Sequence, residues 1–270
     1  KVRMMRAPLR REFALLAVLA AMFVAFSVTT EGFFDWSNVF DRARYWVVPG
    51  IIAVPMTFII ATSGIDLSVA SIVALAGTVM GLAFQEAQAP IAVAACAAIL
   101  AGALAGAFNG GIIGFLGVPP LVVTLATMAL FRGIAMGFSK GAPIGGFPET
   151  FTWISQGDLF AISIGGSPAY IPAPIVALLL VTIVGGLLMR RSWIGRFTEH
   201  VGENETAARF AAIDVRWLTF GIYTACGALC GVAALFHTAL YATAKADTAQ
   251  GMELDVIACV VVGGTRISGG

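Results

Sequence analysis

Charged residues are scarce in this chain of 270 residues. They make up 11% of it, whereas hydrophobic residues make up 59% and the mean hydropathy is +0.92. An average soluble domain is roughly 25% charged, so this chain has too little polar surface to cover its apolar side chains in water. The 16 basic and 15 acidic residues leave a net charge of +1 and no basic field for nucleic acid. These shortages exclude a soluble enzyme, a disordered tail and a nucleic-acid binder.

Cysteine and lysine are also rare, and this limits the chemistry of the chain. The four cysteines lie inside apolar runs without the spacing of metal ligands, so we interpret them as small hydrophobic residues, with redox or metal chemistry as the alternative. Lys1, Lys140 and Lys245 do not lie in a glycine-rich loop that opens a helix, and the phosphate-binding pattern Gly-x-x-x-x-Gly-Lys-Ser/Thr is absent. We therefore expect no cofactor or metal in this chain.

Long apolar runs are what the chain has in place of charge. A bilayer core about 30 Å thick needs about 20 apolar residues per helix, and continuous rather than alternating runs indicate helices rather than barrel strands. We predict an all-α membrane protein, a polytopic helical bundle in which residues 1–270 form a single transmembrane domain that lacks its C-terminal part. The expected spans, about eight by this length rule, are residues 13–30, 46–62, 68–84, 90–108, 119–138, 171–189, 217–237 and 254–264.

Glycine and alanine are concentrated in these runs, for example in residues 101–106 and at Gly185 and Gly186. Small residues let helix backbones approach closely where lipid gives no hydrophobic drive, so we expect close helix contacts there. The alternative is that glycine is simply common in membrane helices.

Basic residues are distributed unevenly between the two sides of the predicted bundle. Most lie before residue 12 and in residues 190–216, which fall on one side when the connections are counted alternately. By the positive-inside rule this side and the N-terminus are cytoplasmic, which makes residues 139–170 an external loop. Arg132 alone lies within a span.

Two segments interrupt the hydrophobic pattern with carboxylates and resemble each other. Residues 64–69 and 251–256 align without a gap and place Asp66 opposite Glu253. An odd number of spans separates the two copies, and this inverts the second copy, as in many transporters that build two gates around one path. We therefore predict an inverted repeat, the alternative being a chance match between helices rich in glycine and alanine.

The charges at these breaks and inside the spans each have two interpretations. Asp66 and Asp255 precede apolar helices, where a carboxylate satisfies free N–H groups, so capping competes with contact to a transported substrate. Arg132 lies about six residues, or roughly 9 Å, from the external end of its helix. It either lines a water-filled path or extends to the membrane interface.

The polar segment 190–216 predicts a short cytoplasmic helix. Asn204 is a capping residue, and early acidic residues and good helix formers follow it as far as about Ala211. A helix held between two spans is suited to transmit force from a partner. The alternative is a solvated loop helix with no partner.

Four blocks in matching order resemble the permease subunits of sugar-type ABC importers, the ribose, xylose, rhamnose and autoinducer-2 group. Two departures from the family pattern are His200, where an aliphatic or small residue is usual, and Ala212, where glycine is usual. The blocks contain Thr62-Ser63-Gly64-Ile65-Asp66-Leu67-Ser68, then Asn109-Gly110 with Val118-Pro119-Pro120 and Arg132-Gly133, then Gly195-Arg196-Phe197 with Asn204-Glu205, and finally Glu253-Leu254-Asp255 with Val262-Gly263-Gly264-Thr265.

This resemblance implies a full chain of about ten helices, with both ends in the cytoplasm, in the cytoplasmic (inner) membrane of a bacterium. The chain would translocate a monosaccharide or similar small polyol by alternating access, while ATP and Mg are bound by a separate ATPase subunit. The implied partners are ATP-binding subunits, a second permease subunit in a homo- or heterodimer, a periplasmic or lipid-anchored sugar-binding protein, and membrane lipid.

The resemblance also implies candidate site residues, none of them catalytic. Residues expected to couple the chain to the ATPase subunit are Gly195, Arg196, Gly202, Asn204, Glu205, Ala208 and Arg209. Residues expected along the translocation path or at its gates are Asp66, Ser68, Asn109, Thr124, Thr127, Arg132, Glu253 and Asp255.

Two other classes of protein are alternatives. An ion-coupled secondary transporter would share the inverted repeat, but Asp66 or Glu253 would then lie deep and bind a proton or sodium, and residues 190–216 would have no role. An intramembrane hydrolase would need a serine that faces His237, and no motif places Ser63 or Ser71 there.

Overall fold

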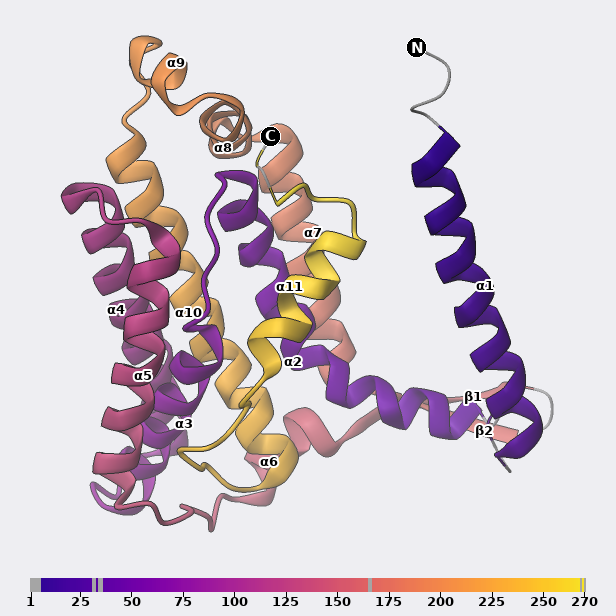
Figure 1. Cartoon of the computed structure of the whole chain (residues 1–270). Helices are drawn as coiled ribbons and strands as arrows, with labels where there is room; N and C mark the ends of the chain where they lie inside the picture. The colour runs from indigo at the N-terminus through magenta and orange to yellow at the C-terminus, as the bar shows by residue number, and fades with distance from the viewer. Residues whose placement is uncertain (1–5, 31–32, 34–35, 165–166, 268, 270) are drawn as a thin grey trace.

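The computed structural model of the chain describes residues 6–30, 33, 36–164, 167–267 and 269. It is a bundle of helices with a two-stranded hairpin to one side (Figure 1). We call the end that carries α8 and α9 the α9 end, and the end that carries α6 the α6 end. The elements are α1 (Arg6–Thr29), α2 (Trp36–Ala61), α3 (Val69–Gln85), α4 (Ile91–Leu116), α5 (Pro120–Ser139), α6 (Glu149–Gln156), β1 (Asp158–Ile164), β2 (Ser167–Pro172), α7 (Pro174–Arg191), α8 (Trp193–Glu203), α9 (Glu205–Phe210), α10 (Val215–Tyr241) and α11 (Met252–Val262).

Five of the described helices, α2, α4, α5, α7 and α10, are long and apolar enough to cross a membrane. Each overlaps one of the predicted spans, which confirms the class of helical membrane protein. The predicted spans near 13–30, 68–84 and 254–264 are helical as well. However, the apolar part of α1, the whole of α3 and the whole of α11 are each shorter than the other five helices. The count of eight crossings therefore stays a prediction.

The core of the bundle is built around α3. Almost every residue of α3 from Val69 to Gly81 is buried, because α4, α5 and α10 pack around it. A helix enclosed by protein needs no polar face, which agrees with the largely apolar sequence of α3.

Glycines at every fourth position bring α4 into backbone contact with α10. Gly102, Gly106, Gly110 and Gly114 share one face of α4, and a β-carbon at Gly106 would lie 2.9 Å from the α-carbon of Gly227 on α10. The predicted close approach at residues 101–106 is confirmed. Gly185 lies against the side chain of Val54 on α2, whereas Gly186 faces open space, so the same expectation is wrong for Gly186.

Residues 139–170 are more ordered than the sequence predicted, because they contain α6 and the antiparallel hairpin β1–β2. Arg44 on α2 holds this segment: its guanidinium donates to the carbonyl oxygens of Ser155 (3.0 Å) and Gly157 (3.1 Å) and pairs with Asp158. The predicted span at 171–189 was wrong at its start. Strand β2 continues to Pro172, and α7 begins at Pro174, where the missing N–H of proline costs no helical hydrogen bond.

The α9 end carries two helices where the sequence predicted one. α9 begins after Asn204, whose side-chain oxygen accepts the N–H of Ala207 at 2.9 Å, so the predicted cap is confirmed. α8 was missed, although Ser192 caps it by accepting the N–H of Gly195 at 3.3 Å. Ala212 follows α9 with φ of 60°, in the left-handed region that favours glycine.

Candidate functional site

The connection between α2 and α3, residues 62–68, carries a buried polar cluster. The side chains of Asp66 and Ser68 are both fully buried. One carboxylate oxygen of Asp66 accepts hydrogen bonds from the backbone N–H of Ser68 at 2.8 Å and from the Ser68 hydroxyl at 2.6 Å. Asn109 on α4 donates its side-chain N–H to the Ser68 hydroxyl at 2.8 Å. Thr124 on α5 donates to the carbonyl oxygen of Ile65 at 3.2 Å.

Four predicted path residues therefore meet at one place, and we call Asp66, Ser68, Asn109 and Thr124 the Asp66 cluster. Its hydrogen bonds join the connection to α4 and α5, which fixes where α3 begins. Asp66 accepts the N–H of Ser68, the N-cap residue of α3, but no described side chain caps α3 by a hydrogen bond, so the capping interpretation of Asp66 stays a prediction. Thr127 lies one turn further along α5, is buried, and donates to the carbonyl oxygen of Thr124 at 3.4 Å.

The Asp66 cluster is not fully satisfied. The second carboxylate oxygen of Asp66 and the amide oxygen of Asn109 are buried without a hydrogen-bond partner among the described residues. A buried polar atom left unpaired costs about 1–3 kcal/mol, so such atoms mark places where a ligand, a water or a movement completes the bonding. Asp66 lies in the connection between α2 and α3, and its carboxylate is fully buried there.

Tyr223 on α10 borders this cluster and was missed by the sequence analysis. It is buried, its hydroxyl has no partner among the described residues, and a β-carbon at Gly64 would lie 2.9 Å from that hydroxyl. Nothing in the sequence separates this tyrosine from the other aromatic residues of an apolar helix. Its role depends on the contact with Gly64, which is distant in the chain.

Arg132 and Glu253 belong to a second group, outside the Asp66 cluster. Arg132 on α5 donates to the carbonyl oxygens of Ala246 (2.7 Å) and Thr248 (2.6 Å), and the carboxylates of Glu253 and Asp247 attract its charge. Arg132 thus holds the connection between α10 and α11, a role that neither interpretation of the sequence included.

Asp255 does not precede α11, so the sequence prediction of its position was wrong. The helix is entered through Gly251, whose φ of 89° suits glycine, and Asp255 lies exposed in the first turn. A carboxylate in the first turn still interacts favourably with the helix dipole. No described side chain caps α11 by a hydrogen bond.

The predicted coupling residues all lie at the α9 end. Glu205 and Arg209 form an ion pair of 2.6 Å along α9, with both side chains about half exposed. An exposed pair at this spacing stabilises a helix by only about 0.3–0.5 kcal/mol, so its charges are available for a partner. Phe210, at the end of α9, is 88% exposed.

The other predicted coupling residues shape this end of the molecule. Asn204 caps α9. Ala208 is buried, so its face of α9 packs against the rest of the protein. A β-carbon at Gly195 would collide with the backbone of Met189, so only glycine allows the tight corner between α7 and α8. Arg196 is exposed on α8, and Gly202 lies beside Gly269.

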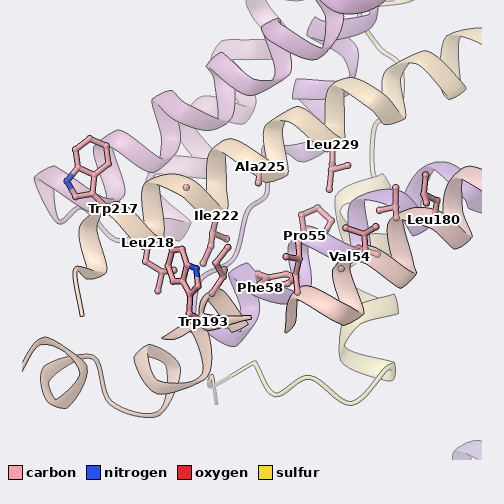
Figure 2. Close-up of a pocket in the computed structure, with 16 residues that line it drawn as sticks. Val54, Pro55, Phe58, Leu180, Trp193, Trp217, Leu218, Ile222, Ala225 and Leu229 are labelled. Atoms are coloured by element: carbon pink, nitrogen blue, oxygen red, sulfur yellow. The ribbon is translucent and has the colours of Figure 1, made fainter. Parts of the chain in front are cut away.

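Two cavities lie near this end, and they differ in chemistry. The larger, about 420 Å³, is an apolar groove between α2, α7, α8 and α10, with Trp193 and Trp217 toward one end (Figure 2). It offers a polar molecule no charged or hydroxyl group. The second, about 270 Å³, we call the α9 cavity; it is lined by Thr62, Gly64, Ile113, Gly114, Gly117, Val118, Pro119, Pro120, Val201, Glu205, Arg209, Val215, Thr219 and Tyr223.

The residues of the hydrolase alternative have other contacts. The ring of His237 packs on that of Tyr241, with centroids 4.7 Å apart, and Ser71 donates to the carbonyl oxygen of Ser68 at 2.7 Å within its own helix. Among the described residues, no group of three or more histidine, cysteine, aspartate or glutamate side chains is placed to hold a metal ion.

The fold and the buried polar break define a multi-pass membrane protein of the transporter class, because polar groups enclosed between apolar helices mark the paths of such proteins. The family described as branched-chain amino acid transport system / permease component matches residues 38–270, and the chain belongs to this family.

Individual relatives match almost the whole chain. The ribose import permease protein RbsC of Escherichia coli strain K12 is 35% identical over 267 residues, which are 98% of this chain and 80% of that protein. The autoinducer 2 import system permease protein LsrD of Klebsiella pneumoniae is 32% identical over 272 residues, 98% of this chain and 79% of that protein. The resemblance to permease subunits of sugar-type ABC importers is therefore confirmed. No solved structure matches the chain.

Proposed function

We propose that this chain imports a monosaccharide or similar small polyol into a bacterial cell, by alternating access driven by separate ATPase subunits. The observation that carries the proposal is the match of 98% of the chain to an import permease whose name specifies ribose. The family description names branched-chain amino acids instead, so the cargo depends on the similarity to individual relatives rather than on the family.

The α9 end faces the cytoplasm in this proposal, and the membrane is the bacterial inner membrane. Its support is the clustering of Arg190, Arg191, Arg196, Arg209 and Arg216 at that end, as the positive-inside rule expects. The N-terminus would then be cytoplasmic, and residues 139–170, with α6 and the hairpin, would be external. The external side would receive the cargo from a periplasmic or lipid-anchored sugar-binding protein.

We further propose that the chain contains an inverted repeat, with about eight crossings in these residues and ten in a complete permease. In support, α3 runs toward the α6 end whereas α11 runs toward the α9 end (Figure 1), with Asp66 just before α3 and Glu253 in the first turn of α11. Two half-helices that point in opposite directions are what two gates around one path require.

Coupling to ATP hydrolysis is assigned to residues 190–216. The capped helix α9 lies between two spans and presents Glu205, Arg209 and the exposed ring of Phe210. Closure of a partner ATPase dimer that grips α9 would move the start of α10, because only residues 211–214 separate the two helices. ATP and Mg would be bound by that partner, and a second permease subunit would complete the transporter.

Uptake by a reconstituted complex tests this function. Proteoliposomes that contain the permease, its ATPase subunits and its binding protein should take up a sugar from a panel of ribose, xylose and rhamnose when ATP is supplied to the α9 side and ion gradients are dissipated. Uptake driven by a proton or sodium gradient without ATP would instead favour the ion-coupled secondary transporter.

A further inference from the structure

The α9 cavity has the chemistry of a site for a small, neutral and polar molecule. Glu205 and Arg209 lie in its wall and neutralise each other, and Thr219 supplies a hydroxyl group. This hydroxyl can donate and accept, which matches a molecule whose own hydroxyls do both. The cavity does not favour an anion, because Arg209 is already paired with Glu205 and the C-terminal end of α4, which carries partial negative charge, lies beside it. It does not favour a cation either, because Glu205 is already paired with Arg209.

The size of the cavity points to the same class. Pockets for drug-sized ligands measure about 300–1,000 Å³, and the α9 cavity, about 270 Å³, is at the lower limit of that range. Val118, Pro119 and Pro120 add apolar surface to the lining, and a sugar ring also has C–H surface to place against it. A single sugar-sized polyol is therefore the class of ligand that suits the cavity.

The inner wall of the cavity is where an unpaired polar atom lies. Gly64 and Tyr223 both line the cavity, and the Tyr223 hydroxyl is buried without a partner among the described residues. The absence of a side chain at Gly64 lets the phenol close against the backbone of the connection 62–68. Two residues further along that connection lies Asp66, which carries another unpaired oxygen. Gly64 and Tyr223 thus separate the cavity from the Asp66 cluster.

We propose that the α9 cavity is a vestibule at the exit of the translocation path, which binds a neutral, hydroxyl-rich cargo before its release, and that Gly64 and Tyr223 close its inner end. This proposal rests on the proposed function, in which the α9 end is cytoplasmic and the cargo is a small polyol. The charged pair in the wall belongs to α9, so movement of α9 by a partner would also change the shape of the vestibule.

Labelling of a cysteine in the wall tests occupancy directly. In a background where the exposed cysteines Cys96 and Cys259 are replaced by alanine, Thr219→Cys is treated with a water-soluble methanethiosulfonate from the α9 side of the reconstituted complex. The sugar that the parent complex imports fastest from the panel should slow labelling at least twofold. Thr206→Cys, exposed on α9 but outside the cavity, should react at the same rate with and without sugar.

Two results would overturn the proposal. Labelling of Thr219→Cys could be unaffected by a sugar that the complex imports, or it could be blocked equally with and without sugar because a partner subunit fills the cavity. Failure of the parent complex to import any sugar would instead contradict the proposed function, and that measurement is made first.

Replacement of the hydroxyl distinguishes a ligand contact from a merely unpaired group. The Tyr223 hydroxyl is buried in this conformation, so cargo would reach it only when the inner end of the cavity opens. Tyr223→Phe should then lower import roughly two- to tenfold, the effect of one lost hydrogen bond, while the melting temperature stays the same or rises because an unpaired buried group is removed. Tyr241→Phe, at the exposed opposite end of α10, should leave import unchanged. A higher melting temperature of Tyr223→Phe with unchanged import would show that the hydroxyl contacts no cargo.

Discussion

Gly64 and Tyr223 meet so closely that a β-carbon at position 64 would lie 2.9 Å from the tyrosine hydroxyl. The two residues are distant in the chain, and they lie where the connection between α2 and α3 passes α10. The close contact explains why position 64 accepts no side chain in this conformation. It also makes a prediction about two substitutions together.

Gly64→Ala should destabilise the permease by about 1–3 kcal/mol, because the added methyl group overpacks a closed site. In the Tyr223→Phe background the clashing oxygen is gone, and the nearest atoms to the new methyl group belong to Ile59 at 3.2 Å. The same substitution should then cost clearly less. Melting temperatures of the four proteins of this double-mutant cycle check the prediction, and equal costs in the two backgrounds would contradict it.

Ser68→Ala should be more damaging than its size suggests. The Ser68 hydroxyl donates to Asp66 and accepts from Asn109, so its removal leaves two further buried groups short of a bond. The expected cost is about 1–3 kcal/mol for each group left unpaired. Ser71→Ala is the matched control, because the Ser71 hydroxyl is also buried but bonds only the carbonyl oxygen of Ser68 in its own turn. If both variants melt at the same temperature, the cluster does not hold the start of α3.

Arg132→Gln should release the connection between α10 and α11. Two carbonyl oxygens lose their charged donor, so the amides of residues 243–250 should exchange hydrogen faster and import should fall more than expression does. Arg42→Gln, an exposed arginine at the same end, is the control and should change neither quantity. Unchanged exchange in residues 243–250 would show that Arg132 does not restrain them.

Ala212→Gly should stabilise the permease by up to about 1 kcal/mol, because Ala212 has φ of 60° and glycine adopts that conformation without strain. The neighbouring Ala211 has φ of −80°, so Ala211→Gly gains nothing from the backbone and should be neutral or destabilising. Thermal unfolding of both variants in the same detergent checks the contrast. A lower melting temperature of Ala212→Gly than of the parent protein would contradict it.

Much of the helix content could be predicted from the sequence, because long apolar runs and capping residues are local signals. The five described helices that are long and apolar enough to cross a membrane, and the cap at Asn204, were found in this way. The hairpin was missed because its strands are short, and because Arg44, which holds it, lies far away in the chain. Helix α8 was missed because its polar face resembles a loop.

The candidate site was predicted in part. Asp66, Ser68, Asn109 and Thr124 were named from the resemblance, but only the packing of α3 between α4 and α5 shows that they form one cluster. Tyr223 could not be predicted, because its partner Gly64 is a contact of the folded chain. Arg132 was noticed as a charge within a span, yet its bonds to Ala246 and Thr248 depend on the course of a connection that the sequence does not reveal.

If α9 transmits ATP-driven movement to the transport path, the ratio of sugar imported to ATP hydrolysed depends on the ion pair of α9. In the reconstituted complex, Glu205→Arg should keep ATP hydrolysis while import falls at least fivefold, since the pair with Arg209 is replaced by repulsion. The double variant Glu205→Arg with Arg209→Glu restores the pair and should recover part of the import, whereas Glu203→Arg, exposed just before α9, should have little effect. An unchanged ratio in Glu205→Arg would show that this ion pair has no part in coupling.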